Sequence, residues 1–175
     1  MVLVPRPATA ADADGVIALF REFMAEIALD PAAPPVAGYV RRAVDEELSR
    51  LRACYLAHPR RGFWVIDDPT AAGALVGSVG VQEVDVATAE LRRMMVRSDC
   101  RRAGLGRRLL VHAERFARTA GYDRLVLATS SLQPAAISLY RRSGYTLESR
   151  TTERQGSARA VAGVERLRFA RSLGK

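Results

Sequence analysis

The chain has 175 residues, of which 49% are hydrophobic and 26% charged, and its formal net charge is +8. These values lie close to the globular average and exclude an intrinsically disordered, collagen-like or coiled-coil chain. The length predicts a single domain over residues 1–175, large enough for its own hydrophobic core.

The charge is distributed unevenly along the chain. Residues 1–90 hold 8 arginines and 13 acidic residues, whereas residues 91–175 hold 19 basic and 6 acidic residues. Seven arginines fall within residues 91–110. This asymmetry indicates an anionic partner for the second half, which could be nucleic acid, phospholipid or a phosphorylated cofactor. A general preference for arginine codons would explain the excess over lysine, but not the clustering.

The cysteines and the chain start point to the cytoplasm. Cys54 and Cys100 are too few for a disulfide framework and predict reduced thiols. His58 and His112 lie far apart and no Cys-x-x-Cys pair occurs, so we expect no metal site. The first residues do not read as a signal peptide, and no apolar stretch reaches the ~20 residues of a membrane helix. We therefore expect a cytoplasmic protein without a membrane partner.

The first half of the chain predicts one short strand, two helices and three strands. Thr9 followed by Asp12 is typical of a helix start, and the proline-rich segment Asp30–Pro35 predicts a loop. Apolar residues recur at helical spacing on both sides of this loop. The expected elements are a strand over Val2–Pro5, helices from Thr9 to Ile27 and over Gly38–His58, and strands over Phe63–Ile66, Ala74–Val81 and Glu90–Val96.

In the second half, helices alternate with strands. Gly121 follows the first of these helices, as is common at a helix C-terminus, and Pro134 opens the second at a position that tolerates proline. The expected elements are helices over Gly104–Ala120 and Pro134–Arg142, strands over Leu125–Ala128, Tyr145–Glu148 and Val164–Ala170, and an exposed hairpin loop over Thr151–Ala162. The strands on either side of the first helix are expected to be parallel neighbours. The order predicts an α/β (α+β) fold.

One stretch carries a chemical signal, namely Arg101-Arg-Ala-Gly-Leu-Gly-Arg107. It follows a predicted strand and opens a helix, where free backbone N–H groups and the helix dipole favour a bound pyrophosphate. The dinucleotide fingerprint GxGxxG and the P-loop GK[ST] are both absent. From these residues alone, an anion-binding turn and a plain tight turn both stay open.

Four motifs in order resemble one family. Arg101-x-x-Gly104-x-Gly106 is similar to the acetyl-CoA signature (Q/R-x-x-G-x-G/A) of the GCN5-related N-acetyltransferases, the GNAT family. The other matches are Arg6-Pro-Ala-Thr-x-x-Asp12, Gly121-Tyr-x-x-Leu125 and Ala136-Ile-x-Leu-Tyr140-x-x-x-Gly144-Tyr145. The resemblance spans the whole chain and is most specific from Glu90 to Tyr145.

The resemblance implies a fold and a cofactor site. The fold would be a mixed, mostly antiparallel sheet of about six or seven strands, flanked by about four helices. Met94–Val96 would splay from the parallel strand Leu125–Ala128. Acetyl-CoA would bind there, with the pantetheine arm on the backbone of Met95 and Val96 and the pyrophosphate on the turn. The implied cofactor-binding residues are Met95, Val96, Arg101, Arg102, Ala103, Gly104, Leu105, Gly106, Arg107 and Gln133, the last standing where the family commonly has Asn.

The resemblance also implies two catalytic residues. Tyr140 matches the general acid that protonates the departing thiolate, although a core tyrosine on an amphipathic helix is the alternative. Glu90 matches a carboxylate that takes the proton of the amine. Glu83, water, or an amine that arrives partly deprotonated are alternatives for this step. Cys100 beside the turn suggests an acyl-cysteine route, but direct transfer in a ternary complex is the family norm.

These features predict an N-acetyltransferase that moves the acetyl group of acetyl-CoA to a primary amine of a small molecule, protein or peptide. The acidic first half would suit a cationic amine such as a polyamine, an aminoglycoside or a lysine side chain. A homodimer is implied by analogy with the family. Two alternatives stay open: a basic nucleic-acid-binding module, which the lack of aromatic residues among the arginines disfavours, and a catalytically silent acetyl-CoA sensor.

Overall fold

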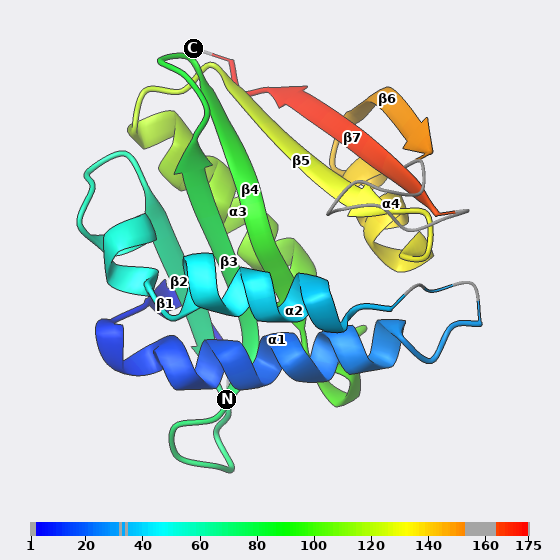
Figure 1. The fold of residues 1–175 in the computed structure, drawn as a ribbon. Coiled ribbons are helices and arrows are strands. Elements are labelled where there is room, and N and C mark those ends of the chain that lie inside the picture. Colours follow the sequence, from blue (N-terminus) through cyan, green and yellow to red (C-terminus); the bar gives the residue numbers. More distant parts are fainter. Residues whose placement is uncertain (1–2, 32, 34, 153–163, 175) are drawn as a thin grey trace.

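The computed structural model describes residues 3–31, 33, 35–152 and 164–174, and its core is a seven-stranded sheet (Figure 1). The strand order is β1-β2-β3-β4-β5-β7-β6. All neighbours are antiparallel except β4 and β5, which are parallel. The strands are β1 (Arg6–Pro7), β2 (Gly62–Asp67), β3 (Leu75–Glu83), β4 (Thr88–Val96), β5 (Arg124–Ser130), β6 (Thr146–Thr152) and β7 (Glu165–Ser172). The predicted fold class, a mixed and mostly antiparallel sheet with one parallel pair, is confirmed.

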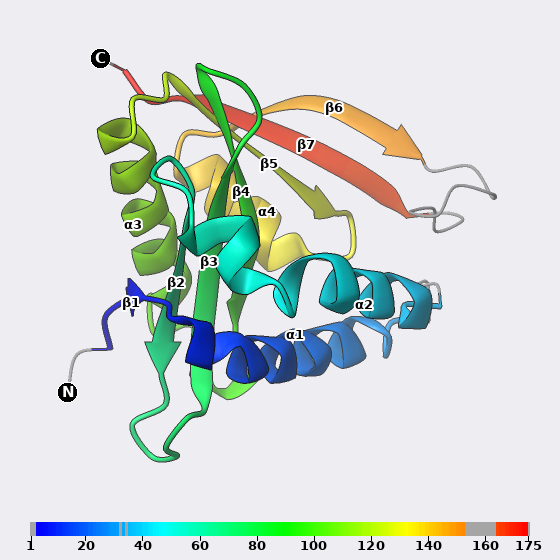
Figure 2. The ribbon, with the colours of Figure 1, turned by 60° about the vertical axis from the view of Figure 1, so that its left-hand side comes forward.

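Helices cover both faces of this sheet. One face carries α1 and α2 across β2, β3 and β4, and the other carries α3 and α4 (Figures 1 and 2). The helical elements are η1 (Ala10–Asp12), α1 (Ala13–Ile27), α2 (Ala37–Ala43), η2 (Val44–Leu48), η3 (Arg52–Leu56), η4 (Ser98–Cys100), α3 (Leu105–Thr119) and α4 (Pro134–Arg142). On the α1/α2 face, β5, β7 and β6 extend beyond the helices, so that this face has an open side next to β4 (Figure 1).

Two hydrophobic cores lie on opposite faces of the sheet. Along β2, Trp64 and Ile66 join the core under α3 and α4, whereas Phe63 and Val65 join the core under α1. Alternate residues of a strand point to opposite faces. A strand that is buried on both faces therefore has a continuous apolar sequence, as β2 has.

The predicted first strand, Val2–Pro5, is wrong in position. Val2 lies outside the described residues, and the structure places the strand at Arg6–Pro7, where it pairs with Val65 and Trp64 of β2. The Arg6 guanidinium donates to Asp67 at the end of β2 and to Asp12 of η1, at 2.6 and 2.7 Å. These two ion pairs hold Arg6 against the sheet edge, a long-range contact that the local apolar pattern does not reveal.

The predicted helix Gly38–His58 is interrupted. Only Ala37–Ala43 is α-helical, and two wider π-helical segments follow, η2 and η3. The N–H of Ser49 donates to the carbonyl of Val44, five residues back, at 2.9 Å. Single π-turns occur frequently at functional sites. Here the wide turn carries Glu47, a buried carboxylate described below.

The other predicted elements are confirmed, with boundaries that differ by a few residues. The strands β2, β4, β5 and β7 extend past their apolar centres, because backbone ladders continue through polar residues. Most of the predicted loop Thr151–Ala162 lies outside the described residues; Thr151 and Thr152 belong to β6. No helix among the described residues is long and apolar enough to cross a bilayer.

Candidate active site

The parallel strands β4 and β5 separate part of the way along their length. Their pairing runs from Thr88↔Arg124 to Leu91↔Leu127, although β4 continues to Val96 and β5 to Ser130. Backbone groups of residues 92–96 that face β5 therefore have no partner on that strand. The separation of the two strands that the family resemblance implies is therefore present. On β5 it begins at Ala128, because Leu125–Leu127 are still paired with β4.

A β-bulge shapes β4 at this separation. Arg92 pairs with Gly80 and Met95 pairs with Ser78, so Arg93 and Met94 together oppose one residue of β3. Arg93 has a φ of 50°, which is uncommon for a residue other than glycine. The Ser78 hydroxyl donates to the Arg93 carbonyl at 2.9 Å. Bulges of this kind often lie next to active sites, where they redirect side chains.

The hydrogen bonds to β3 decide which N–H groups of β4 face the gap. The N–H of Arg97 donates to the carbonyl of Val76 on β3 at 2.9 Å. Residues alternate in the direction of their N–H groups along an antiparallel pair. The N–H of Met95 therefore faces β3, and the N–H of Val96 faces the gap between β4 and β5.

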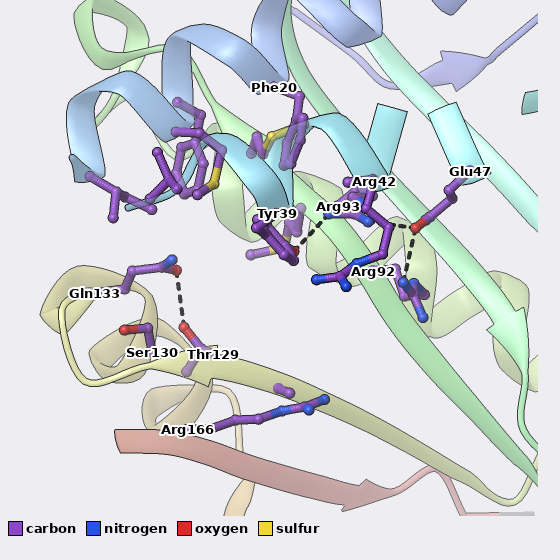
Figure 3. Close-up of a pocket in the computed structure, with 18 of the residues that line it drawn as sticks. Phe20, Tyr39, Arg42, Glu47, Arg92, Arg93, Thr129, Ser130, Gln133 and Arg166 are labelled. Carbon is purple, nitrogen blue, oxygen red and sulfur yellow. Dashed lines mark hydrogen bonds and ion pairs between the residues drawn. The ribbon is translucent and has the colours of Figure 1, made fainter. Parts of the chain in front are cut away.

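A cavity of about 890 Å³ opens on the α1/α2 face of this gap (Figure 3). Its walls come from α1, α2 and η2 on one side and from β4, β5, β7 and α4 on the other. Four of the residues singled out from the sequence line it: Glu90, Met95, Gln133 and Tyr140. Val96 and the turn 101–107 are not part of this lining.

The turn from Arg101 to Arg107 adjoins the end of β4. Arg102 and Gly104 both have left-handed backbones, with φ of 63° and 80°, and Leu105 is the first residue of α3. A turn of this kind followed by a helix N-terminus presents several N–H groups that lack helical acceptors. An added Cβ on Gly106 would lie 3.4 Å from Leu139 of α4 and 4.0 Å from Val96. The turn thus places several free N–H groups at the open end of the β4–β5 gap.

The arginine cluster of residues 91–110 divides into two groups. Four of its members pair with carboxylates of the chain, namely Arg92, Arg93, Arg97 and Arg101, and Arg108 donates to the carbonyl of Leu3. Arg102 and Arg107 are exposed and form no ion pair within the described residues. The free positive charge of the cluster is therefore concentrated at the turn.

The side chain of Arg101 serves the packing of the turn. It donates to the carbonyl of Val96 at 3.0 Å and to Glu26 of α1 at 2.6 Å. Its guanidinium also lies 6.0 Å from the ring centroid of Phe23. These contacts connect the turn to β4 and α1, so the Arg101 side chain holds the turn in place.

Tyr140 lies on α4 with its ring in the core beneath the sheet. Tyr140 is 5% exposed, and its ring packs near Tyr145 and Phe169, at centroid distances of 5.9 and 6.1 Å. Burial raises the pKa of its phenol, so the hydroxyl keeps its proton. Tyr140 is thus both buried in the core and part of the cavity wall, and its role as general acid stays a prediction. Gln133, which precedes α4, accepts a hydrogen bond from Thr129 at 3.0 Å (Figure 3).

The two candidate carboxylates for the base lie in different places. Glu90 lines the cavity from β4, is 24% exposed and accepts a hydrogen bond from Arg92 at 3.2 Å. Glu83 is absent from the cavity wall, and it pairs with Arg60 at 3.6 Å and with the Tyr122 hydroxyl at 3.4 Å. Of the two carboxylates, only Glu90 is within the cavity.

A buried ion network beside Glu90 was not predicted from the sequence. Glu47 of η2 accepts hydrogen bonds from Arg92 at 2.9 Å and from Arg93 at 2.5 Å (Figure 3). It also accepts one from the Tyr55 hydroxyl. Burial alone would raise the pKa of Glu47, but the two guanidiniums outweigh it and hold the pKa below its usual value. Glu47 is therefore a fixed anion and a poor base. A sequence signal for the network does exist, since two adjacent arginines interrupt an otherwise apolar strand.

Cys100 lies in η4 beside the turn. Burial and the neighbouring Asp99 raise the pKa of its thiol, which disfavours the thiolate that an acyl-cysteine route needs. Within the described ranges, no cluster of three or more His, Cys, Asp or Glu side chains is arranged to hold a metal ion.

Comparisons with known proteins agree with this geometry. Residues 23–145 match the model of the acetyltransferase (GNAT) family. N-acetyltransferase 8 of Rattus norvegicus is 31% identical over 119 residues, and that of Homo sapiens is 28% identical over 116 residues. Each alignment covers 65% of this chain and 52% or 51% of the relative. The chain thus spans about half the length of the curated relatives it matches.

Solved structures share the fold over nearly the whole chain. An acetyltransferase of the GNAT family from Staphylococcus aureus superposes with a TM-score of 0.76 at 16% identity, covering 98% of this chain and 99% of that one. A phosphinothricin acetyltransferase from Sinorhizobium meliloti, solved in complex with acetyl-CoA, gives a TM-score of 0.70 at 20% identity, covering 99% and 90%.

Proposed function

The chain belongs to the GNAT family of acetyltransferases, and on that premise we propose that it transfers an acetyl group from acetyl-CoA to a primary amine. One observation carries the proposal: β4 and β5 separate beside an N–H-rich turn, and the cavity at the separation contains Tyr140 and Glu90. A donor and an acceptor can therefore meet there from opposite sides of the sheet.

The residues at the gap fit acetyl-CoA. The turn 102–107 has the left-handed backbones and the helix N-terminus that bind a pyrophosphate, with Arg102 and Arg107 as exposed counter-charges. The unpaired edge of β4 offers hydrogen bonds to the amides of a pantetheine arm. Acetyl-CoA, when bound, supplies an activated acyl thioester. A related protein, the Sinorhizobium meliloti enzyme, was solved with this ligand.

The N–H of Val96 is positioned to stabilise negative charge on the acyl oxygen. It faces the gap, whereas the N–H of Met95 is directed to β3. A donor aimed at a developing oxyanion contributes roughly 3–4 kcal/mol to transition-state stabilisation. The bulge at Arg93 sets the direction of this part of the strand. Of the two residues that the family resemblance places beside the pantetheine arm, Met95 and Val96, we therefore assign this role to Val96.

Two side chains move the protons. Glu90 takes a proton from the amine, directly or through water, because it is the cavity carboxylate on the strand that carries Val96. Tyr140 gives a proton to the leaving thiolate, and its raised pKa keeps that proton available at physiological pH. Gln133 also lines the cavity, and its side-chain amide contributes to the contacts with the donor. A homodimer stays a prediction from the family resemblance, and a cytoplasmic location stays a prediction from the cysteine content.

The nucleic-acid alternative loses part of its support. It rested on the basic second half of the chain, residues 91–175, but in the densest part of that half, residues 91–110, four of the seven arginines pair with carboxylates of the same chain. The two exposed members lie at one compact turn. Such an arrangement suits a small phosphorylated ligand better than an extended polyanion.

A thermal-shift titration with acetyl-CoA tests the cofactor assignment. At 100 times its Kd a ligand stabilises a protein by about 2.7 kcal/mol, which corresponds to roughly 5–11 °C for a chain of this size. Gly106→Val would lose the shift, because its methyl groups enter the space between Val96 and Leu139. Gly106→Ala, whose Cβ makes only ordinary contacts, is the matched control and would keep it. An unchanged melting temperature of the wild-type protein at millimolar acetyl-CoA would contradict the proposal.

A further inference from the structure

An exposed aromatic ring lies on the cavity wall opposite the sheet. Six large apolar residues in the described part of the chain are substantially exposed, and of these only Tyr39 lines the cavity. Its exposed fraction is 40%. Phe23, Ile27 and Val36 are half-buried and line the same wall. These residues form an apolar patch with Tyr39 on the α1/α2 side of the cavity, next to the charged residues of α2 and η2.

The ring of Tyr39 is held in place by its hydroxyl. Arg93 donates to that hydroxyl at 2.9 Å, and Glu47 fixes Arg93 in turn (Figure 3). Phe20 meets the Tyr39 ring edge-on, with centroids 6.1 Å apart. The ring is therefore ordered before any ligand arrives, so that a ligand packing on it has little side-chain entropy to remove. An ordered but exposed aromatic face at a cavity has the character of a binding surface.

The charge on the cavity wall disfavours a polycation. The wall carries five arginines and five carboxylates, and Arg92 and Arg93 already share the most buried carboxylate, Glu47. The acidic character of residues 1–90 is thus not reproduced in the cavity. An acceptor with several positive charges would meet arginines on both sides, with Arg166 on β7 opposite Arg93 on β4 (Figure 3).

We propose that the acceptor is a primary amine with a single positive charge and one aromatic or similarly bulky apolar substituent, which packs against Tyr39. This proposal rests on the acetyl transfer proposed above and names its substrate class. The amine would approach Glu90 while the substituent lies against the α1/α2 wall. A hydrophobic contact of this size discriminates by roughly 10- to 100-fold.

Steady-state kinetics with three amines test the proposal. The probes are 2-phenylethylamine, ethylamine and spermidine, each with saturating acetyl-CoA. We expect kcat/KM for 2-phenylethylamine to exceed that for the other two by at least 10-fold. Tyr39→Ala would lower this value about 10-fold through KM, leave kcat within about twofold and leave ethylamine unaffected. A variant with a merely structural defect would affect all three amines equally.

Two further variants sharpen the result. Tyr39→Phe keeps the ring but loses the bond to Arg93, so we expect an intermediate KM. Leu29→Ala removes another exposed apolar side chain, 82% exposed and outside the cavity wall, and would behave as wild type. Equal kcat/KM for the three amines, or a preference for spermidine, would overturn the substrate class while leaving acetyl transfer intact.

A binding measurement keeps the test independent of turnover. Calorimetry compares N-acetyl-2-phenylethylamine with N-acetylethylamine on the wild-type protein and on Tyr39→Ala. Tighter binding of the aromatic product that is lost in Tyr39→Ala supports Tyr39 as the binding surface for the substituent. If this is found but no amine is acetylated, only the proposed function fails. Equal binding of the two products overturns the surface.

Discussion

Replacing Glu47 by glutamine removes the one negative charge that two guanidiniums share. The side chains of Glu47 and Arg93 are 10% and 8% exposed, and that of Arg92 is 33% exposed. Glutamine has nearly the same shape and keeps a carbonyl that can accept hydrogen bonds. The substitution therefore isolates the loss of charge from the loss of packing.

The expected cost follows from these exposures. Breaking a buried ion pair by removing one partner costs about 3–5 kcal/mol, because the other charge is left uncompensated. Arg92 is partly hydrated and still has Glu90 at 3.2 Å, so the lower end applies and we expect about 3 kcal/mol. For a chain of this size that is a fall in Tm of roughly 6–12 °C.

Urea unfolding at pH 7 measures this cost, and Glu90→Gln is the matched control. Glu90 makes a single ion pair with Arg92 and is 24% exposed, so its substitution would cost no more than about 1 kcal/mol. Equal free energies of unfolding for the two variants, or a loss below 1 kcal/mol for Glu47→Gln, would refute the reasoning.

The difference in free energy of unfolding between wild type and Glu47→Gln is expected to depend on pH in one direction. The arginines hold the pKa of Glu47 in the folded protein below its unfolded value, which is near 4.3. The ion network therefore contributes fully above about pH 5, and its contribution falls as pH drops through the folded-state pKa. The gap in stability between wild type and Glu47→Gln narrows on acidification. A gap that widens below pH 5 would contradict this assignment.

Two other predictions concern the proton transfers. Tyr140→Phe would lower kcat by roughly 100- to 1,000-fold without changing the affinity for acetyl-CoA measured by calorimetry. Because burial raises the pKa of Tyr140, the activity of the wild-type enzyme would not decline through ionisation of this phenol below pH 10. Full turnover in the variant would refute the acid role. Glu90→Gln would lower kcat/KM at least 10-fold at pH 7, whereas Glu83→Gln, which lies outside the cavity, would leave it within twofold; the reverse order would exchange their roles.

Local chemistry made much of the fold predictable. Thr9 and Asp12 form reciprocal contacts at the first helical turn, with the Thr9 N–H donating to Asp12 at 2.7 Å. The helix α4 begins and ends where the sequence predicts, at Pro134 and Arg142. Gly121 has the positive φ of a helix C-terminus. Each of these signals depends on a residue's own backbone and its nearest neighbours.

The errors occur where distant residues decide the backbone. The helix predicted over Gly38–His58 widens into π-turns, one containing Glu47 and the other Tyr55. The partners of Glu47 lie 45 and 46 positions away, on β4, and the partner of Tyr55 is Glu47 itself. The first strand is displaced to Arg6 by its ion pairs with Asp67 and Asp12. Periodicity of apolar residues does not encode such contacts.

The site was predictable where it depends on backbone and less so where it depends on side chains. The glycine pattern at 104 and 106 indicated the turn directly. Tyr39 and Glu47 carried no motif, because their roles arise from packing against Arg93. One sequence signal was available: adjacent Arg92 and Arg93 in a strand would point to opposite faces, so a bulge was needed to place both on one face.

The most direct measurement of the central claim is acetyl transfer itself. Free-thiol release from acetyl-CoA is followed together with mass spectrometry of 2-phenylethylamine and ethylamine, using wild-type protein and Tyr140→Phe. The account predicts amine-dependent thiol release, a product heavier than the amine by the mass of one acetyl group less one hydrogen, and a large loss of rate in the variant. Tight acetyl-CoA binding without acetylation of either amine would contradict the account and favour a catalytically silent sensor.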